Sequence, residues 1–86
     1  MATSLIKNNT GYDIRECSIV TNRGKEELSW FDDGDSIKRA YTVIPPSLVG
    51  YIRKDGEDVL VTAEAKSVGS PRGVLWVFNK VHIEDD

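Results

Sequence analysis

The sequence predicts an all-β fold, a small antiparallel β-sandwich of about seven strands with an immunoglobulin-like architecture; a small Greek-key barrel is the alternative. Apolar and polar residues alternate along short runs, which is typical of half-buried strands. Turn-forming residues interrupt these runs at the roughly 8–12-residue spacing of all-β domains. No segment has the sustained 3.6-residue period and capping residues of a helix. The 86 residues suffice for one core, so residues 1–86 are expected to form a single domain.

The first two strands are "SLIK" and "YDIRECSIVT", separated by the turn "NNTG". The second run does not alternate cleanly, because its apolar residues Ile14 and Cys17 are three positions apart. One extra residue near Arg15 and Glu16, a β-bulge, would place Ile14, Cys17 and Ile19 on one face. We therefore expect a bulge in the second strand.

The third strand, "EELSWF", follows the turn "NRGK". Alternation places Leu28 and Trp30 together on the core face and leaves Phe31 on the opposite, exposed face. The fourth strand, "SIKRAYTVI", comes after the turn "DDGD" and ends at "PPS", because proline cannot donate to a central ladder.

The fifth and sixth strands, "LVGYIRK" and "DVLVTAEAK", flank Asp55 and Gly56, a strong hairpin signal. After the polar loop "SVGSPRG", the run "VLWVFNKVHI" forms the seventh strand. That strand is apolar on both faces, so we expect it to be central in the sheet. Any unpaired edge strand could also pair with a second copy and form a homodimer.

Composition excludes several classes of function. The net charge of −3 argues against a nucleic-acid partner, which needs Lys and Arg to neutralise phosphates. No run approaches the roughly 18 apolar residues of a membrane-spanning helix, so we expect no membrane partner. Cys17 is the only cysteine and no intramolecular disulfide can form, which favours a reducing, cytoplasmic location. The chain is expected to be a small acidic cytoplasmic protein.

We predict no enzyme and no catalytic residues. The single cysteine and single histidine, Cys17 and His82, could form a thiol enzyme only if the fold brought them together. The pattern instead indicates a buried Cys17 and an exposed or edge position for His82. Two such residues are also too few for a usual zinc site, and the chain has no phosphate-binding or dinucleotide-binding motif.

The acidic segment "DDGDS" has two interpretations. Asp and Gly are the residues that tight turns require, so the segment is expected to be a surface turn. The alternative is a calcium-binding β-domain, since calcium prefers clustered oxygen ligands. Its metal ligands would be Asp32, Asp33, Asp35 and Ser36.

The leading functional hypothesis is a non-enzymatic binding module whose partner is another protein, for example an inhibitor or immunity-type protein. The run "VIPPSLVGY" carries this hypothesis, because an apolar loop stiffened by two prolines can be presented to a partner. The predicted partner-binding residues are Ile44, Pro45, Pro46, Leu48 and Phe31.

Charge adds a second element to this hypothesis. Four cations flank the apolar run, namely Lys38, Arg39, Arg53 and Lys54. If the strands on either side of the prolines paired, these cations would cluster and could attract an acidic partner. The commoner use of such residues is to protect an edge strand from aggregation.

Overall fold

The computed structural model describes residues 3–40, 44–70 and 73–84, and within these ranges the chain is all-β, with no helical residue. The polar–apolar alternation produces strands because each strand can bury one face. The strands are β1 (Thr3–Asn8), β2 (Ile14–Thr21), β3 (Gly24–Phe31), β4 (Ser36–Ala40), β5 (Ser47–Lys54), β6 (Glu57–Ser70), β7 (Gly73–Phe78) and β8 (His82–Ile83).

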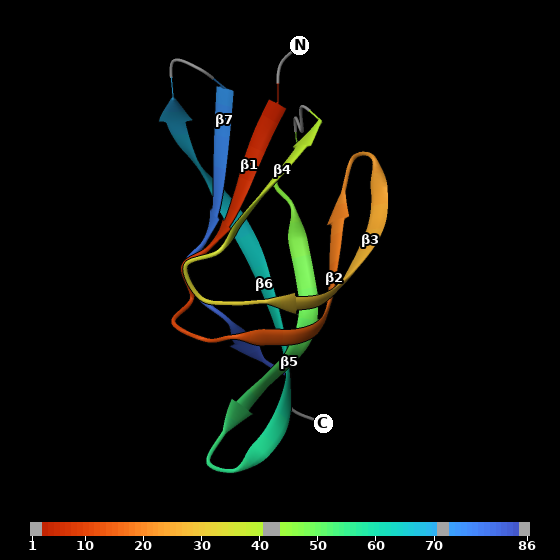
Figure 1. The fold of residues 1–86 in the computed structure, drawn as a ribbon, viewed down its shortest axis with the longest axis vertical. Coiled ribbons are helices and arrows are strands. Elements are labelled where there is room, and N and C mark those ends of the chain that lie inside the picture. Colours follow the sequence, from red (N-terminus) through yellow and green to blue (C-terminus); the bar gives the residue numbers. More distant parts are fainter. Residues whose placement is uncertain (1–2, 41–43, 71–72, 85–86) are drawn as a thin grey trace.

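The strands form one strongly curled sheet in the order β3-β2-β5-β6-β7-β1-β4 (Figure 1). The 14-residue β6 joins two wings, because its first half pairs with β5 and its second half with β7. The short β8 pairs with the first half of β6. This half-barrel does not confirm an immunoglobulin-type sandwich and fits the barrel alternative instead.

Each predicted strand is present, but the boundaries of several differ. The sixth continues to Ser70, into the segment "SVGSPRG" that was expected to be a loop, and the fourth is described only to Ala40. The seventh is interrupted between Phe78 and His82 and so becomes β7 and β8. Neighbouring strands are antiparallel except β1 and β7, which are parallel, so the expectation of a purely antiparallel sheet is wrong at this pair. The prediction that the seventh strand is central is confirmed, since β7 lies between β6 and β1, and the adjacent residues Trp76 and Val77 are both buried.

The predicted bulge in β2 is also confirmed. The pairing of β2 with β5 shifts register between Arg15 and Ser18, and Glu16 has a φ of 49°, in the left-handed region. Ile14 and Cys17 both point into the core as a result, and each is 0% exposed.

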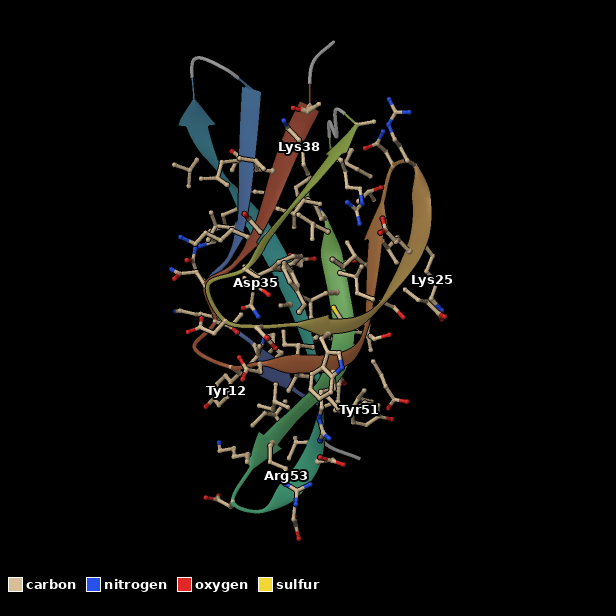
Figure 2. All side chains as sticks on the ribbon, viewed as in Figure 1. Tyr12, Lys25, Asp35, Lys38, Tyr51 and Arg53 are labelled. Carbon is tan, nitrogen blue, oxygen red and sulfur yellow. The ribbon has the colours of Figure 1, made fainter. Side chains whose placement is uncertain are left out.

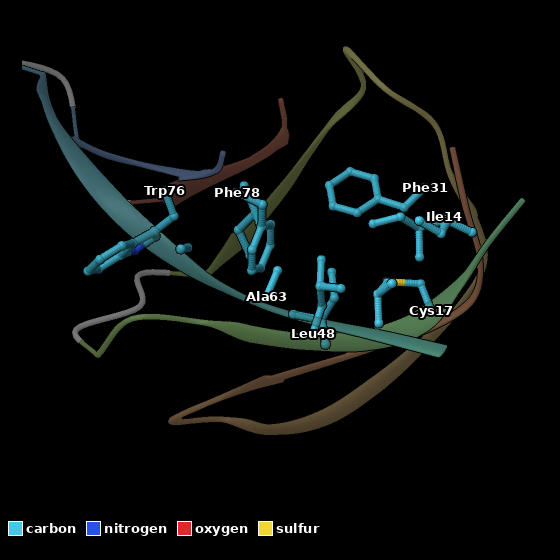
Figure 3. Packing of buried hydrophobic residues seen from close by; sticks show 12 residues of the cluster. Ile14, Cys17, Phe31, Leu48, Ala63, Trp76 and Phe78 are labelled. Carbon is cyan, nitrogen blue, oxygen red and sulfur yellow. The ribbon is translucent and has the colours of Figure 1, made fainter. Parts of the chain in front are cut away.

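The core fills the concave side of the curled sheet (Figure 3). Phe31 of β3 and Phe78 of β7 meet in its centre in a T-shaped contact, with ring centroids 6.4 Å apart. Because these strands lie in opposite wings, this contact holds the two wings together. The buried cluster contains Ile6, Ile14, Cys17, Ile19, Phe31, Leu48, Ile52, Val61, Ala63, Ala65, Trp76 and Phe78.

Two connections cross from one wing to the other at the same end of the barrel, β1 to β2 and β3 to β4 (Figure 1). The fully buried Asn8 joins them: its Nδ2 donates to the carbonyls of Tyr12 (2.9 Å) and Phe31 (2.7 Å). Its Oδ1 accepts from the backbone N–H and the hydroxyl of Thr10 (3.0 and 2.7 Å). The amide therefore satisfies backbone groups that a crossing loop would otherwise leave unpaired.

The Asp55–Gly56 hairpin is confirmed. Both residues have positive φ, 53° and 80°, as a type I′ turn requires. The long β5–β6 ribbon extends beyond the barrel and contributes to an elongated outline of 42 × 22 × 20 Å (Figure 1). Within the described ranges the structure contains no helix of the length and apolar character needed to cross a bilayer.

The expected cation cluster around the prolines is wrong. The fourth strand pairs with β1, and the fifth pairs with β2 and β6, so the two runs are not partners. Lys38 and Arg53 consequently lie toward opposite ends of the molecule (Figure 2).

Candidate functional site

The apolar loop that was expected to dock a partner is largely part of the core. Pro46 and Leu48 are both buried, and the Pro46 carbonyl accepts a hydrogen bond from the Ala65 N–H (2.9 Å). This bond extends the β5–β6 pairing beyond Ser47, which explains why the segment turns inward. Only Ile44 and Pro45 of the predicted binding residues in this loop are exposed. Val43, the first residue of the run, lies outside the described residues.

The expectation for the two aromatic residues at the end of β3 is reversed. Phe31, expected at the surface, is 1% exposed, whereas Trp30, expected in the core, is 61% exposed. The cause is the bulge in β2. The pairing of β3 with β2 keeps the same register on both sides of the bulge, so β3 follows the bulged spacing. Ile14 pairs with Phe31 and Cys17 with Leu28, so the three-residue spacing of inward positions is imposed on β3 as well.

The acidic segment forms a turn that is hydrogen-bonded to the connection between β1 and β2. The Asp33 carboxylate accepts the N–H of Gly11 (3.0 Å), and the Asp13 carboxylate accepts the N–H of Asp33 (2.9 Å). These bonds hold the two crossing connections against each other. Burial, Asp13 and Asp35 together raise the pKa of Asp32. Within the described ranges, no group of three or more acidic, cysteine or histidine side chains has a metal-binding arrangement.

Cys17 and His82 occupy different environments. The thiol lies in the core, and burial raises its pKa from 9.0 to about 11. His82 is exposed on β8, where it pairs with Thr62 of β6. A cavity of about 620 Å³ adjoins His82, and Ser47, Glu64 and Lys80 also line it, but Cys17 does not. A thiol that is un-ionised at neutral pH is a poor nucleophile, which argues against the thiol-enzyme alternative.

Four residues on neighbouring strands form a continuous line on the convex face of the sheet, which we call the outer row: Trp30, Arg15, Tyr51 and Leu60. Trp30 of β3 pairs with Arg15 of β2, Arg15 with Tyr51 of β5, and Tyr51 with Leu60 of β6. Directly paired residues have Cβ atoms about 5 Å apart, so the four side chains are neighbours along the row. Tyr51 and Leu60 are 36% and 37% exposed, and with Trp30 they form an accessible apolar surface.

The charged member of the outer row has a fixed position. The Arg15 guanidinium lies 6.0 Å from the centre of the Trp30 ring and forms an ion pair with Asp58. Arg53 also reaches Asp58 (3.3 Å). A surface cavity of about 470 Å³ lies here, bounded by the Arg15, Trp30, Tyr51 and Asp58 side chains among others. The arrangement offers an aromatic wall, an oriented cation and a carboxylate within one hollow.

The alternation of residues in β3 did not reveal this surface, although the bulge that the sequence predicts in β2 was a sign of it. The predicted bulge changes which residues face inward in β2, and Trp30 becomes exposed once the same change is applied to its partner β3. Comparison of the chain with protein-family models, with curated proteins and with solved structures finds no match. The geometry of this chain alone must therefore support a functional proposal.

Proposed function

We propose that this protein is a non-enzymatic binding module that acts on another protein through the outer row. The observation that carries the proposal is that Trp30, Tyr51 and Leu60 are exposed in one row across the sheet, together with the half-buried Arg15. An inhibitor or immunity-type protein is one version of this function, since such proteins act by covering a surface of their partner. The single free thiol, Cys17, supports a cytoplasmic location for the proposed function.

The composition of the outer row supports a protein partner. Trp, Tyr and Arg are the residues that most often dominate the binding energy of protein interfaces. Their positions on a hydrogen-bonded sheet, with Arg15 held by Asp58, reduce the side-chain entropy lost on binding.

A second exposed row provides the natural control. On the other wing, Leu5 of β1, Leu75 of β7 and Val68 of β6 are paired neighbours, and Leu5 and Val68 are 42% and 48% exposed. This row is aliphatic and has no aromatic side chain. It is therefore similar in exposure to the outer row but lacks its Trp, Tyr and Arg.

The test compares partner capture by the tagged wild-type protein and the Trp30→Ala and Leu5→Ala variants from a lysate of the source cells. We expect one stoichiometric partner with the wild type and Leu5→Ala, and a loss of about 30-fold in affinity with Trp30→Ala. That loss corresponds to roughly 2 kcal/mol, the threshold of a binding hot spot. Equal recovery by Trp30→Ala, with its melting temperature unchanged, would contradict the proposal.

Calcium binding by Asp32, Asp33, Asp35 and Ser36 is the second candidate function. The observation in its favour is that the pKa of Asp32 is raised, first by desolvation and then by repulsion from Asp13 and Asp35, and a cation would relieve the repulsion. Against it, Asp33 already accepts the Gly11 N–H. We expect superimposed thermal melts in calcium and in chelator. Calcium at a hundred times its dissociation constant would instead add about 2.7 kcal/mol and raise the midpoint by roughly 10 °C or more.

A further inference from the structure

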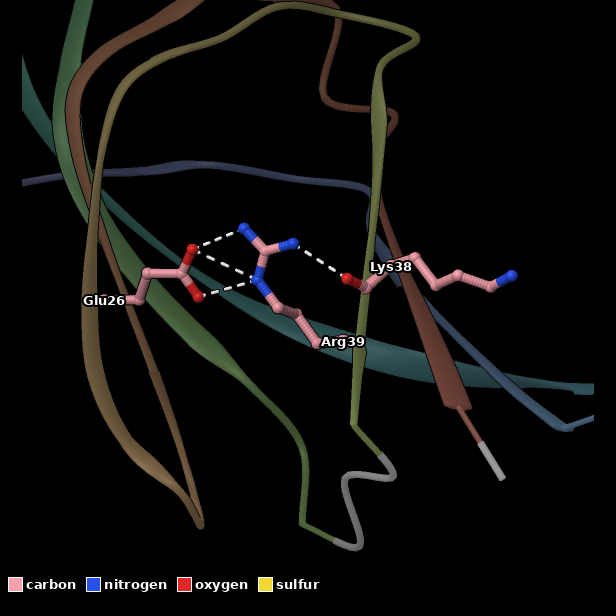
Figure 4. A network of polar contacts seen from close by, with 3 residues as sticks. All are labelled: Glu26, Lys38 and Arg39. Carbon is pink, nitrogen blue, oxygen red and sulfur yellow. Dashed lines mark hydrogen bonds and ion pairs between the residues drawn. The ribbon is translucent and has the colours of Figure 1, made fainter. Parts of the chain in front are cut away.

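The half-barrel is open between its two terminal strands, β3 and β4, and we call this opening the seam. In the described part of the chain no backbone ladder joins the two strands, although they follow each other in sequence. A side-chain bridge crosses the seam instead: the Arg39 guanidinium binds the Glu26 carboxylate, with Nε 2.7 Å from Oε1 (Figure 4). Arg39 also donates to the carbonyl of Lys38 on its own strand (2.7 Å).

The interior of the seam is lined by both apolar and charged residues. A cavity of about 280 Å³ lies between the two strands, with Ile6, Ile19 and Ile37 on its walls and Glu26 and Arg39 also lining it. Pockets for small molecules usually measure about 300–1,000 Å³. This cavity is at the lower limit, and its size fits an inserted apolar side chain better than a whole ligand.

The cavity of the seam has a basic lining. Three basic residues (Arg23, Lys25 and Arg39) line it against one acidic residue (Glu26), a balance of +2. Lys25 also approaches Glu27 (3.9 Å), and the acidic turn at residues 32–35 follows the other end of β3. The whole chain has a net charge of −3. The seam is therefore a local positive region on an acidic protein, and it favours a partner of negative charge.

We propose that the seam binds an acidic peptide segment of a partner protein in an extended conformation. The backbone of the peptide adds to the free edge of β3 or β4, as in β-strand addition. One apolar side chain of the peptide enters the cavity between Ile19 and Ile37. A carboxylate on the peptide replaces Glu26 as the partner of Arg39, so the internal ion pair closes the seam until the peptide displaces it.

Charge favours an acidic peptide over self-pairing of like strands. Antiparallel pairing of two β4 strands about Lys38, or of two β3 strands about Lys25, would place these lysines opposite each other. An acidic peptide gains from the same charges. The cavity and the charged residues of the seam share no residue with the outer row, although Trp30 also belongs to β3. The proposal goes beyond the function proposed above, and variants at Lys25 and Lys38 test it separately from Trp30→Ala.

The experiment measures fluorescence anisotropy with a labelled eight-residue peptide of alternating glutamate and valine. A control peptide of alternating glutamate and proline has the same charge but cannot pair in a ladder, because proline lacks the N–H. A peptide of alternating lysine and valine tests the sign of the charge. We expect only the glutamate–valine peptide to bind and to protect amide protons of β3 or β4 from exchange.

Matched variants locate the site. Lys25→Glu with Lys38→Glu is expected to weaken binding about tenfold, whereas Lys54→Glu with Lys66→Glu, which changes the net charge equally away from the seam, leaves it within about twofold. Glu26→Gln is expected to strengthen binding about threefold, because it removes the competing carboxylate. The proposal is overturned if the glutamate–proline peptide binds equally well, if the two double variants behave alike, or if none of the peptides binds.

Discussion

Gly50 of β5 lies opposite the bulge of β2, between Val49 and Tyr51, which pair with Ser18 and Arg15. A Cβ atom at this position would lie 2.5 Å from Cγ2 of Ile14, 3.1 Å from the carbonyl oxygen of Arg15 and 3.3 Å from Cα of Cys17. The nearest of these atoms belongs to a fully buried side chain, and the other two belong to the backbone. The bulge and the glycine are therefore complementary, and Gly50→Ala is a direct test of this packing.

The crowding around Gly50 sets the loss of unfolding free energy expected for Gly50→Ala. Inserting a methyl group into a well-packed core costs about 1–3 kcal/mol, since neighbours must leave their preferred rotamers or the backbone must shift. In a domain of this size the loss corresponds to a decrease of roughly 5–20 °C in melting temperature. Urea denaturation followed by tryptophan fluorescence measures the free energy of unfolding directly.

A double-mutant cycle identifies the cause. Ile14→Ala removes the methyl group that the new Cβ would meet, whereas Ile14→Val keeps a methyl at that position and shortens only the far end. Gly50→Ala should therefore cost less in the Ile14→Ala background than in the wild type, and about the same in Ile14→Val. An equal cost of Gly50→Ala in all three backgrounds would refute the proposed clash with Ile14.

Three further predictions concern single residues. Phe31→Ala should lower the free energy of unfolding by about 3–5 kcal/mol, because it empties the centre of the core, and chemical denaturation measures this loss. Cys17 should resist a thiol reagent at pH 8 in the native protein and react once the protein unfolds. Its folded pKa of about 11 exceeds the unfolded value of 9.0, so between these two pH values the thiol ionises only in the unfolded state. The free energy of unfolding should therefore fall as the pH rises from 9.0 to about 11, and Cys17→Ala should not show this fall. The hydrogen bond to Arg39 lowers the pKa of Glu26 from 4.5, so its stabilisation is present above pH 4.5 and disappears as the pH falls through the folded pKa. Glu26→Gln should remove that pH dependence in acid titrations followed by circular dichroism, with a loss of under about 1 kcal/mol at neutral pH because the pair is partly exposed.

Local rules predicted most of the strands and turns. The spacing of Ile14 and Cys17 was enough to place the bulge, and Asp55–Gly56 was enough to place the hairpin. These features depend on neighbouring residues. The exposure of Trp30 depends on the register with another strand, so the pattern of β3 considered by itself gave the wrong face.

Strand partners were harder to predict than strands. The fourth strand pairs with β1, and this pairing continues past β4, because the Asn8 N–H donates to the carbonyl of Asp35 (2.9 Å) and the Gly34 N–H to the carbonyl of Asn8 (2.7 Å). Nothing in the sequence around Asn8 distinguishes this buried amide from an ordinary turn residue. The cation cluster considered around the prolines does not form for the same reason, because it required the fourth and fifth strands to pair with each other.

The acidic turn and the open seam have one structural origin. A short turn such as residues 32–35 usually joins two paired strands, but here the chain after Phe31 crosses to the other wing, where β4 joins β1. The Asp13 and Asp33 carboxylates hold this crossing by accepting backbone N–H groups. Because β3 and β4 are thereby placed at opposite ends of the sheet, neither closes the barrel, and the bridge from Glu26 to Arg39 spans the remaining opening. The topology that gives the acidic turn a structural role also makes β3 and β4 the terminal strands of the sheet.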